Sequence, residues 1–165
     1  MSANLSDTGA GDEGFMRRAI AVADEGLQAG QTPFGACVVR DGRVVAAAHN
    51  AVWARTDITA HAEIVAIRRA CEVLRTIDLS GCDVYSTCEP CPMCFAACHW
   101  ARIRRIVFGT RIADAEAAGF HEMPIGNDRM KALGGSEVTI VPDVLRDECA
   151  ALFTRWADRR DRRAY

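Results

Sequence analysis

The chain has little net charge, no long apolar run and no apolar segment near its start. Its 165 residues carry a formal charge of −2, which gives no overall attraction to nucleic acid or to an anionic membrane. No uninterrupted apolar run approaches the roughly 20 residues that span a bilayer. Residues 1–14 are rich in glycine, serine and aspartate and lack the apolar core of a signal peptide. We therefore expect a cytoplasmic protein whose eight cysteines stay reduced.

Length and composition predict one folded domain. Half of the residues are hydrophobic, which is enough to build a core at this length without disulfide staples. No internal repeat and no linker divides the chain. We expect a flexible lead-in over residues 1–14 and a single domain over residues 15–165.

Apolar periodicity predicts alternating helices and strands. Helices are expected over residues 15–30, 60–74, 92–101, 113–119 and 144–155, and strands over residues 34–40, 43–50, 83–87, 105–110 and 137–141. Asp41 and Gly42 form a two-residue hairpin signal between the first two strands. Residues 83–110 read as a strand–helix–strand crossover, which implies parallel pairing. Residues 120–135 are expected to form a long loop or lid.

The segment from His61 to Cys94 contains the residue types of a hydrolytic metal site. His61, Cys91 and Cys94 supply one imidazole and two thiols, and a catalytic zinc takes three protein ligands and leaves a fourth position for water. Thr59 can cap a helix whose first turn contains His61 and Glu63. Residues two apart in a helix point about 200° apart around its axis, so one of the pair binds the metal and Glu63 is left for proton transfer.

The two cysteines are expected at the start of a second helix. Pro92 suits the first helical position, which puts Cys91 at the N-cap and Cys94 one turn further on. Both sulfurs then lie beside unpaired amides at the positive end of the helix dipole. That environment favours the thiolate, which is the form that binds a metal.

Two other metal sites fit the cysteine spacing. Cys88 could be a fourth ligand and close a structural zinc site, as in a metal-stapled binding module rather than an enzyme. Alternatively, Cys88, Cys91, Cys94 and Cys98 match the spacing of a ferredoxin cluster loop, although His99 replaces the usual proline. Bound iron with visible absorbance would identify the second alternative. Neither alternative gives Glu63 a role.

The pattern His-x-Glu followed by Pro-Cys-x-x-Cys resembles the signature of the cytidine deaminase-like superfamily of zinc-dependent deaminases. The resemblance implies an α/β fold, a three-layer α-β-α sandwich around a five-stranded mixed sheet. It also implies Zn²⁺ as the cofactor, with His61, Cys91 and Cys94 as metal ligands and Glu63 as the catalytic proton shuttle. The predicted reaction is a hydrolytic deamination that releases ammonia.

Within this superfamily the chain looks most like the bacterial guanine deaminases, from Phe34 to Tyr165. The segments that carry this likeness include Thr32-Pro33-Phe34-Gly35-Ala36, Cys88-Glu89-Pro90-Cys91-Pro92-Met93-Cys94, Trp100-Ala101-Arg102, Ala117-Ala118-Gly119-Phe120-His121-Glu122, Asn50 and Tyr165. The resemblance implies that guanine is the substrate and that the protein acts in purine metabolism. It implies substrate-binding positions at Phe34, Asn50, Ala62, Trp100 and Tyr165, and a second catalytic acid at Glu122. It further implies a homodimer with exchanged C-terminal segments, so that Tyr165 completes the partner's site.

These assignments have structural alternatives. Phe34 and Trp100 could be ordinary core residues, Asn50 could cap a strand end, and Glu122 could be a solvated loop acid. Some guanine deaminases have Asp where this chain has Glu122, and the longer side chain could reshape the pocket.

The substrate also has alternatives. Five arginines near the C-terminus form a basic run that can be a footprint for nucleic acid: Arg155, Arg159, Arg160, Arg162 and Arg163. A tRNA adenosine-to-inosine deaminase therefore stays an alternative. The interleaved Asp158 and Asp161 weaken that interpretation, because they offset the basic charge. Cytosine, guanosine and an s-triazine such as ammeline are other candidate substrates.

Overall fold

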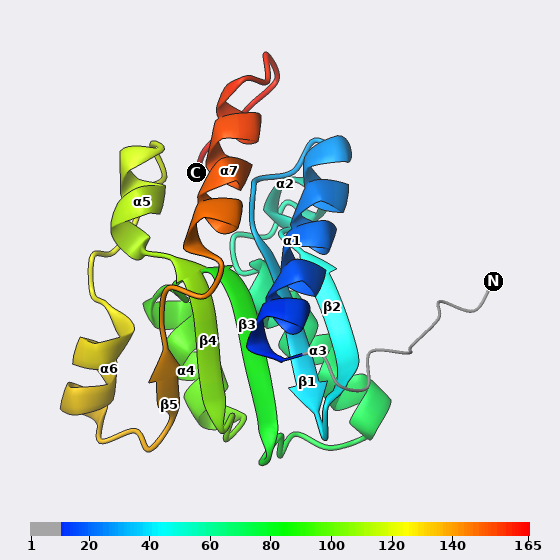
Figure 1. The fold of residues 1–165 in the computed structure, drawn as a ribbon, viewed down its shortest axis with the longest axis vertical. Coiled ribbons are helices and arrows are strands. Elements are labelled where there is room, and N and C mark those ends of the chain that lie inside the picture. The colour runs from blue at the N-terminus through cyan, green and yellow to red at the C-terminus, as the bar shows by residue number, and fades with distance from the viewer. Residues whose placement is uncertain (1–10) are drawn as a thin grey trace.

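The computed structural model describes residues 11–165, which pack around one five-stranded sheet (Figure 1). The strands are β1 (Gly35–Arg40), β2 (Arg43–His49), β3 (Cys82–Cys88), β4 (Arg105–Thr110) and β5 (Thr139–Val141). Their order across the sheet is β2-β1-β3-β4-β5. Strand β1 pairs antiparallel with β2 and β3, whereas β3, β4 and β5 run parallel. The prediction of a mixed five-stranded sheet is confirmed.

Helices cover both faces of this sheet. They are α1 (Asp12–Gln28), α2 (Val52–Arg55), α3 (Ala62–Leu74), α4 (Pro92–Trp100), α5 (Ile112–Ala117), α6 (Asn127–Gly134) and α7 (Arg146–Ala157). Helices α1 and α7 pack on one face, and α3 and α4 lie on the other (Figure 1). The result is the three-layer α-β-α arrangement that the superfamily resemblance implies. Among residues 11–165, no helix is both long and apolar enough to cross a membrane.

Side-chain alternation along the strands divides the core into two layers. In β1, Val38 faces α3 and α4 whereas Val39 faces α1. Neighbouring strands repeat this alternation, with Val84 of β3 in the first layer and Tyr85 in the second. All seven residues of β3 are buried, as expected for the central strand of a sheet covered on both faces.

The two connections that define the topology follow the sequence signals. Asp41 and Gly42 both adopt positive φ, at 51° and 69°, as a two-residue hairpin turn between β1 and β2 requires. The crossover from β3 through α4 to β4 gives parallel pairing, with Cys88 beside Thr110 at the last rung. The carboxyl ends of β3 and β4 therefore lie at the same edge of the sheet, where open α/β folds place their ligands.

Several element boundaries and caps differ from the predictions. Helix α1 begins at Asp12, three residues inside the expected lead-in, because the Asp12 carboxylate accepts hydrogen bonds from Tyr85 (2.7 Å) and Arg105 (2.7 Å). The rest of the lead-in, up to residue 10, lies outside the described residues. Thr59 does not cap α3, because its hydroxyl donates to Asp57 (2.6 Å) and His61 occupies the N-cap.

Two short helices were missed. Helix α2 follows β2 directly, and α6 occupies the second half of the segment expected to be a loop. In α6 most side chains are exposed, so the residues show little apolar periodicity. Its first residue, Asn127, is fully buried, and α6 packs against α4. Tertiary contacts therefore stabilise a helix that the local sequence does not predict.

Candidate active site

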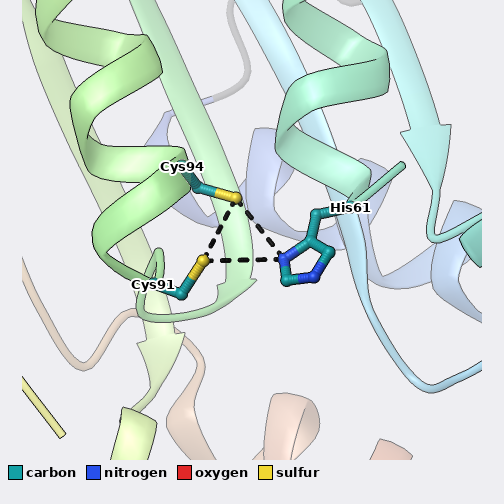
Figure 2. Close-up of side chains that lie close together, drawn as sticks. All are labelled: His61, Cys91 and Cys94. Atoms are coloured by element: carbon teal, nitrogen blue, oxygen red, sulfur yellow. Dashed lines mark hydrogen bonds between the residues drawn. The ribbon is translucent and has the colours of Figure 1, made fainter. Parts of the chain in front are cut away.

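Three metal-binding side chains meet at the carboxyl edge of the sheet (Figure 2). His61 is the N-cap of α3, Cys91 is the N-cap of α4, and Cys94 lies in the first turn of α4. The two sulfur atoms are 3.6 Å apart, and the Nδ1 atom of His61 lies 3.6 Å from each of them. Tetrahedral zinc with its usual bond lengths spaces such donors about 3.6 to 3.8 Å apart. The triangle therefore fits a zinc ion.

The local fold of the cysteine turn follows its sequence. Cys91 is extended and Pro92 begins α4, as the spacing predicts. The hydrogen bond from the Cys94 thiol lowers the pKa of Cys91 to about 4, whereas burial raises the pKa of Cys94 well above its usual value. Cys91 is therefore a thiolate at neutral pH, and a divalent cation would displace the proton of Cys94.

His61 lies next to this thiolate at the start of α3. Burial alone would lower the pKa of His61, but its hydrogen bond with Cys91 and the charge of Glu63 outweigh burial and raise it. The negative charges of Cys91 and Glu63 thus favour a positive charge at this position. They would stabilise a bound metal ion in the same way.

Glu63 lies beside the triangle but is not one of its donors. It is the second residue of α3, 6% exposed, and accepts a hydrogen bond from the Ser86 hydroxyl (3.2 Å). Burial raises the pKa of Glu63, which suits a carboxyl group that exchanges protons. Glu63 and His61 line the same small pocket. His61 is the extended N-cap of α3 and not part of its first turn, yet only His61 of the two belongs to the donor triangle.

Neither alternative cysteine site matches this geometry. Cys88 lines the pocket, but its thiol donates to the backbone carbonyl of Arg111 (3.4 Å) and lies outside the donor triangle. Cys98 is buried in the apolar layer between the sheet and α3. The remaining cysteines are small core residues, as expected, except that Cys71 is only half-buried: Cys37, Cys71, Cys82 and Cys149.

Four of the residues expected to bind substrate border the same pocket: Phe34, Asn50, Glu122 and Tyr165. Phe34 is half-buried and packs edge-on against Phe120, with ring centroids 4.9 Å apart. Asn50 is fully buried, and its side-chain oxygen accepts the amide of Val52 (3.1 Å). The Asn50 amide group donates to the Tyr165 hydroxyl (2.6 Å). The pocket thus combines an aromatic wall with a hydrogen-bonding edge.

Glu122 is half-buried beside the pocket. It lies on the segment between α5 and α6, and it lines both the inner pocket and an adjoining hollow of about 370 Å³. Burial raises the pKa of Glu122 to about 7. A carboxyl group with such a pKa can hold or give up a proton under physiological conditions.

Tyr165 reaches the site of its own chain. Its carbonyl accepts the backbone amide of His121 (2.9 Å), and its ring lies 5.5 Å from the His61 ring. The inner pocket between these rings measures only about 20 Å³. The C-terminal residue therefore occupies much of the space beside the metal donors.

Two expected substrate positions do not line the pocket. Trp100 is 83% exposed at the far end of α4 and contacts His99, so it does not line the pocket of its own chain, and its place beside the base stays a prediction. Trp100 follows Cys94 by six positions along α4, which is a rise of about 9 Å. Ala62 is fully buried at the first position of α3, with its side chain in the apolar core.

Sequence reasoning missed two polar residues at the site. Ser86 bonds Glu63, and strand alternation could have placed it on the face that α3 covers. Glu89 lines the inner pocket and is 9% exposed, although it was noted only as part of the cysteine motif. Its bonding partners lie more than 20 residues away along the chain, so no local pattern signals them.

A three-layer fold, a histidine–dicysteine triangle and a buried glutamate beside it define a zinc-dependent hydrolytic deaminase. Residues 10–110 match the family model described as the cytidine and deoxycytidylate deaminase zinc-binding region. The chain belongs to this family. Guanine deaminase from Bacillus subtilis is 46% identical over 111 residues, which cover 67% of this chain and 71% of that protein.

Two further relatives cover more of the chain. The solved structure of guanine deaminase from Nitrosomonas europaea is 34% identical, with a TM-score of 0.82 over 88% of this chain and 84% of that one. The tRNA-specific adenosine deaminase of Bacillus subtilis is 33% identical over 143 residues, or 87% of this chain and 86% of that protein. The family thus includes relatives that differ in substrate. The residues of the pocket must therefore decide which substrate this chain binds.

Proposed function

We propose that this enzyme hydrolyses guanine to xanthine and ammonia. The observation that carries the proposal is the donor triangle beside buried Glu63, in a pocket that also contains Phe34, Asn50 and Glu122. Two of the relatives described above are named guanine deaminases, which favours a purine base over other amino-heterocycles. His61, Cys91 and Cys94 are the proposed zinc ligands, and Glu63 and Glu122 are the proposed catalytic groups.

The chemistry divides between the metal and the carboxylates. When bound at His61, Cys91 and Cys94, zinc lowers the pKa of water from 15.7 towards about 7. Glu63 accepts the proton from the water that attacks the carbon bearing the amino group. It delivers this proton to the adjacent ring nitrogen, then takes the second proton from the newly attached hydroxyl group and passes it to the departing amine. One C–O bond forms, one C–N bond breaks, and ammonia leaves.

The other pocket residues suit a flat base with a polar edge. Phe34 offers an aromatic wall, and Asn50 presents a donor and an acceptor from one amide group. Glu122 as a carboxylate can accept from the ring N–H and the amino group of guanine. Its pKa of about 7 also lets it assist the transfer of a proton. Tyr165 closes the pocket from the side of the C-terminus.

A substrate panel tests the proposed activity. Ammonia release is measured with guanine, guanosine, cytosine, cytidine, adenine, ammeline and a tRNA anticodon stem-loop, each with purified zinc-loaded protein. We expect guanine to give a kcat/KM at least about 100-fold above any other compound, because a buried polar pocket strongly rejects substrates that leave its groups unpaired. A higher kcat/KM with the stem-loop or with another base would reject guanine as the substrate.

The C-terminal arginines support a small substrate rather than RNA. Several are already engaged within the chain: Arg155 with Asp24, Arg159 with Asp161, and Arg162 with backbone carbonyls. The guanidinium of Arg163 stacks on Trp53, 4.3 Å from the ring centroid. A guanidinium that is paired or stacked in this way offers less to a phosphate backbone. The basic run thus anchors the tail that ends at Tyr165.

We also propose that the enzyme is a homodimer. Helix α4 exposes Met93 and Trp100, which are one heptad apart and so share a face of the helix. A tryptophan exposed to this degree is unusual outside a binding surface, and Trp100 is a natural anchor for a second copy. In such a dimer the C-terminal segment that packs on the site could instead cross to the partner and present Tyr165 there.

A mixing experiment tests this exchange. One variant carries Glu63→Gln with an intact tail, and the other keeps Glu63 but lacks Tyr165. Each alone should be nearly inactive. If tails are exchanged, refolding the two variants together restores activity. In a mixed dimer, the Glu63→Gln chain then places its Tyr165 in the site of the chain that keeps Glu63. Statistical mixing then gives about a quarter of the wild-type activity, whereas no recovery would show that each tail serves its own chain.

A further inference from the structure

Glu89 is a buried carboxylate that the reaction does not use. It follows directly after β3 and precedes the cysteine turn, and its own amide donates to the carbonyl of Thr110 (2.8 Å). One carboxylate oxygen accepts the backbone amide of Asn127 (2.8 Å), and the other accepts the amide of Ile112 (3.3 Å). Among residues 11–165, the ion pairs do not include Glu89. Backbone amides hold this charge in place of a cation.

The two amides belong to the first residues of two helices. Ile112 begins α5 and Asn127 begins α6, and the N-cap of α6, Gly126, has no side chain that could accept a helix amide. Glu89 therefore satisfies one unpaired amide at the start of each helix and meets the positive end of both dipoles. Between α5 and α6 runs the segment 118–126, which carries Glu122. A single carboxylate thus ties together the helices on both sides of this segment.

A second hydrogen bond from Asn127 joins the same two parts of the chain. The side chain of Asn127 donates to the carbonyl of Pro90 (2.6 Å), and Asn127 has no exposed surface. The chain is also tightly packed here, since a Cβ atom on Gly126 would lie 3.2 Å from the Glu89 carboxylate. The residue next to Pro90 is Cys91, a donor of the metal triangle. The residues just before the cysteine turn and the start of α6 are therefore joined by two hydrogen bonds, both donated by Asn127.

We propose that Glu89 is a positioning residue that holds segment 118–126 against the cysteine turn and thereby fixes Glu122 at the substrate. This inference rests on the proposed function of Glu122. It gives the Glu89 carboxylate a role beyond that of a helix cap, because Glu89 lies just before the cysteine turn and belongs to neither helix. Glu89 acts through Glu122 and touches no reacting atom.

A double-mutant cycle tests the proposal with Glu89→Gln, Glu122→Gln and the double variant. In Glu89→Gln an NH₂ group faces one of the backbone amides, so one helix start loses its acceptor. We expect kcat/KM for guanine to fall about tenfold or more, with zinc content unchanged. In the Glu122→Gln background the same substitution should cost less than about twofold, because the group that Glu89 positions is already lost.

Asp114→Asn is the matched control. Asp114 accepts the backbone amide of Arg111 (2.7 Å) and so caps the same helix α5, but it does not line the pocket. Its effect on kcat/KM should be the same with Glu122 or with Gln at that position. Asn127→Ala is a second probe of the link, for use if Glu89→Gln does not fold. This substitution keeps the backbone amide that donates to Glu89 and loses the hydrogen bond to Pro90. Its effect on kcat/KM should also vanish in the Glu122→Gln background.

The possible outcomes distinguish the proposed function of Glu122 from the positioning role of Glu89. A full effect of Glu89→Gln in the Glu122→Gln background would overturn the positioning role, and so would loss of zinc from Glu89→Gln. If Glu122→Gln alone turns over guanine normally, the proposed function of Glu122 fails, and the role of Glu89 fails with it. If Glu122→Gln is impaired and the effects of both substitutions simply multiply, only the inference about Glu89 is wrong.

Discussion

Replacing Glu63 by glutamine abolishes turnover and leaves zinc in the protein. Glutamine has nearly the same size and can still bond Ser86, so the pocket keeps its shape. It cannot accept and return a proton, and general acid–base catalysis contributes typically 10²- to 10⁴-fold. We expect kcat for guanine to fall by about a thousandfold or more. Steady-state ammonia release measures the loss, and elemental analysis measures the zinc.

Glu72→Gln is the control for this substitution. Glu72 lies on the same helix, α3, but its side chain is exposed on the solvent side. The exchange removes the same charge and should leave both kcat and zinc content unchanged. Turnover by Glu63→Gln within a few-fold of the wild type would remove Glu63 from the proton-transfer role. Loss of zinc from Glu63→Gln would instead mean that its carboxylate supports the metal site.

The metal triangle was predictable from sequence because short-range chemistry determines it. Cys91 and Cys94 are three residues apart, and Pro92 sets the start of the helix that brings them together. His61 comes from a distant segment, but it too lies at a helix start. Each donor thus depends mainly on its own helix start, and the sheet brings the two helix starts together. The residue spacing already contains most of the information about where each donor lies on its helix.

The differences from the predictions arise where specific side-chain partners, and not apolar periodicity or a motif, decide the structure. Thr59 was expected to cap α3, yet nearby Asp57 offers its hydroxyl an acceptor two residues away. Helix α6 has few apolar residues, and its start is fixed by Glu89 from another part of the chain. Trp100 matches a family motif, but a motif does not say whether a side chain faces its own pocket or a neighbouring molecule.

Substitution of Cys91 by serine should remove both zinc and activity. A serine hydroxyl keeps its proton at neutral pH, so only two of the three donors can bind the metal. We expect zinc affinity to fall at least about 100-fold, and turnover to fall with zinc occupancy. Competition with a chromophoric chelator measures the affinity, and ammonia release at saturating zinc shows whether activity returns when the site is forced to fill.

Cys88→Ala is the informative companion to Cys91→Ser. Cys88 lines the pocket and is the one neighbouring thiol that could close the coordination sphere, yet it donates to a backbone carbonyl instead. An open site predicts that Cys88→Ala keeps full zinc affinity, because the fourth position belongs to water and substrate. If Cys88→Ala lost zinc as Cys91→Ser does, the ion would have four protein ligands. The attacking water would then have no position on the metal, and the protein would be a zinc-stapled module rather than a hydrolase.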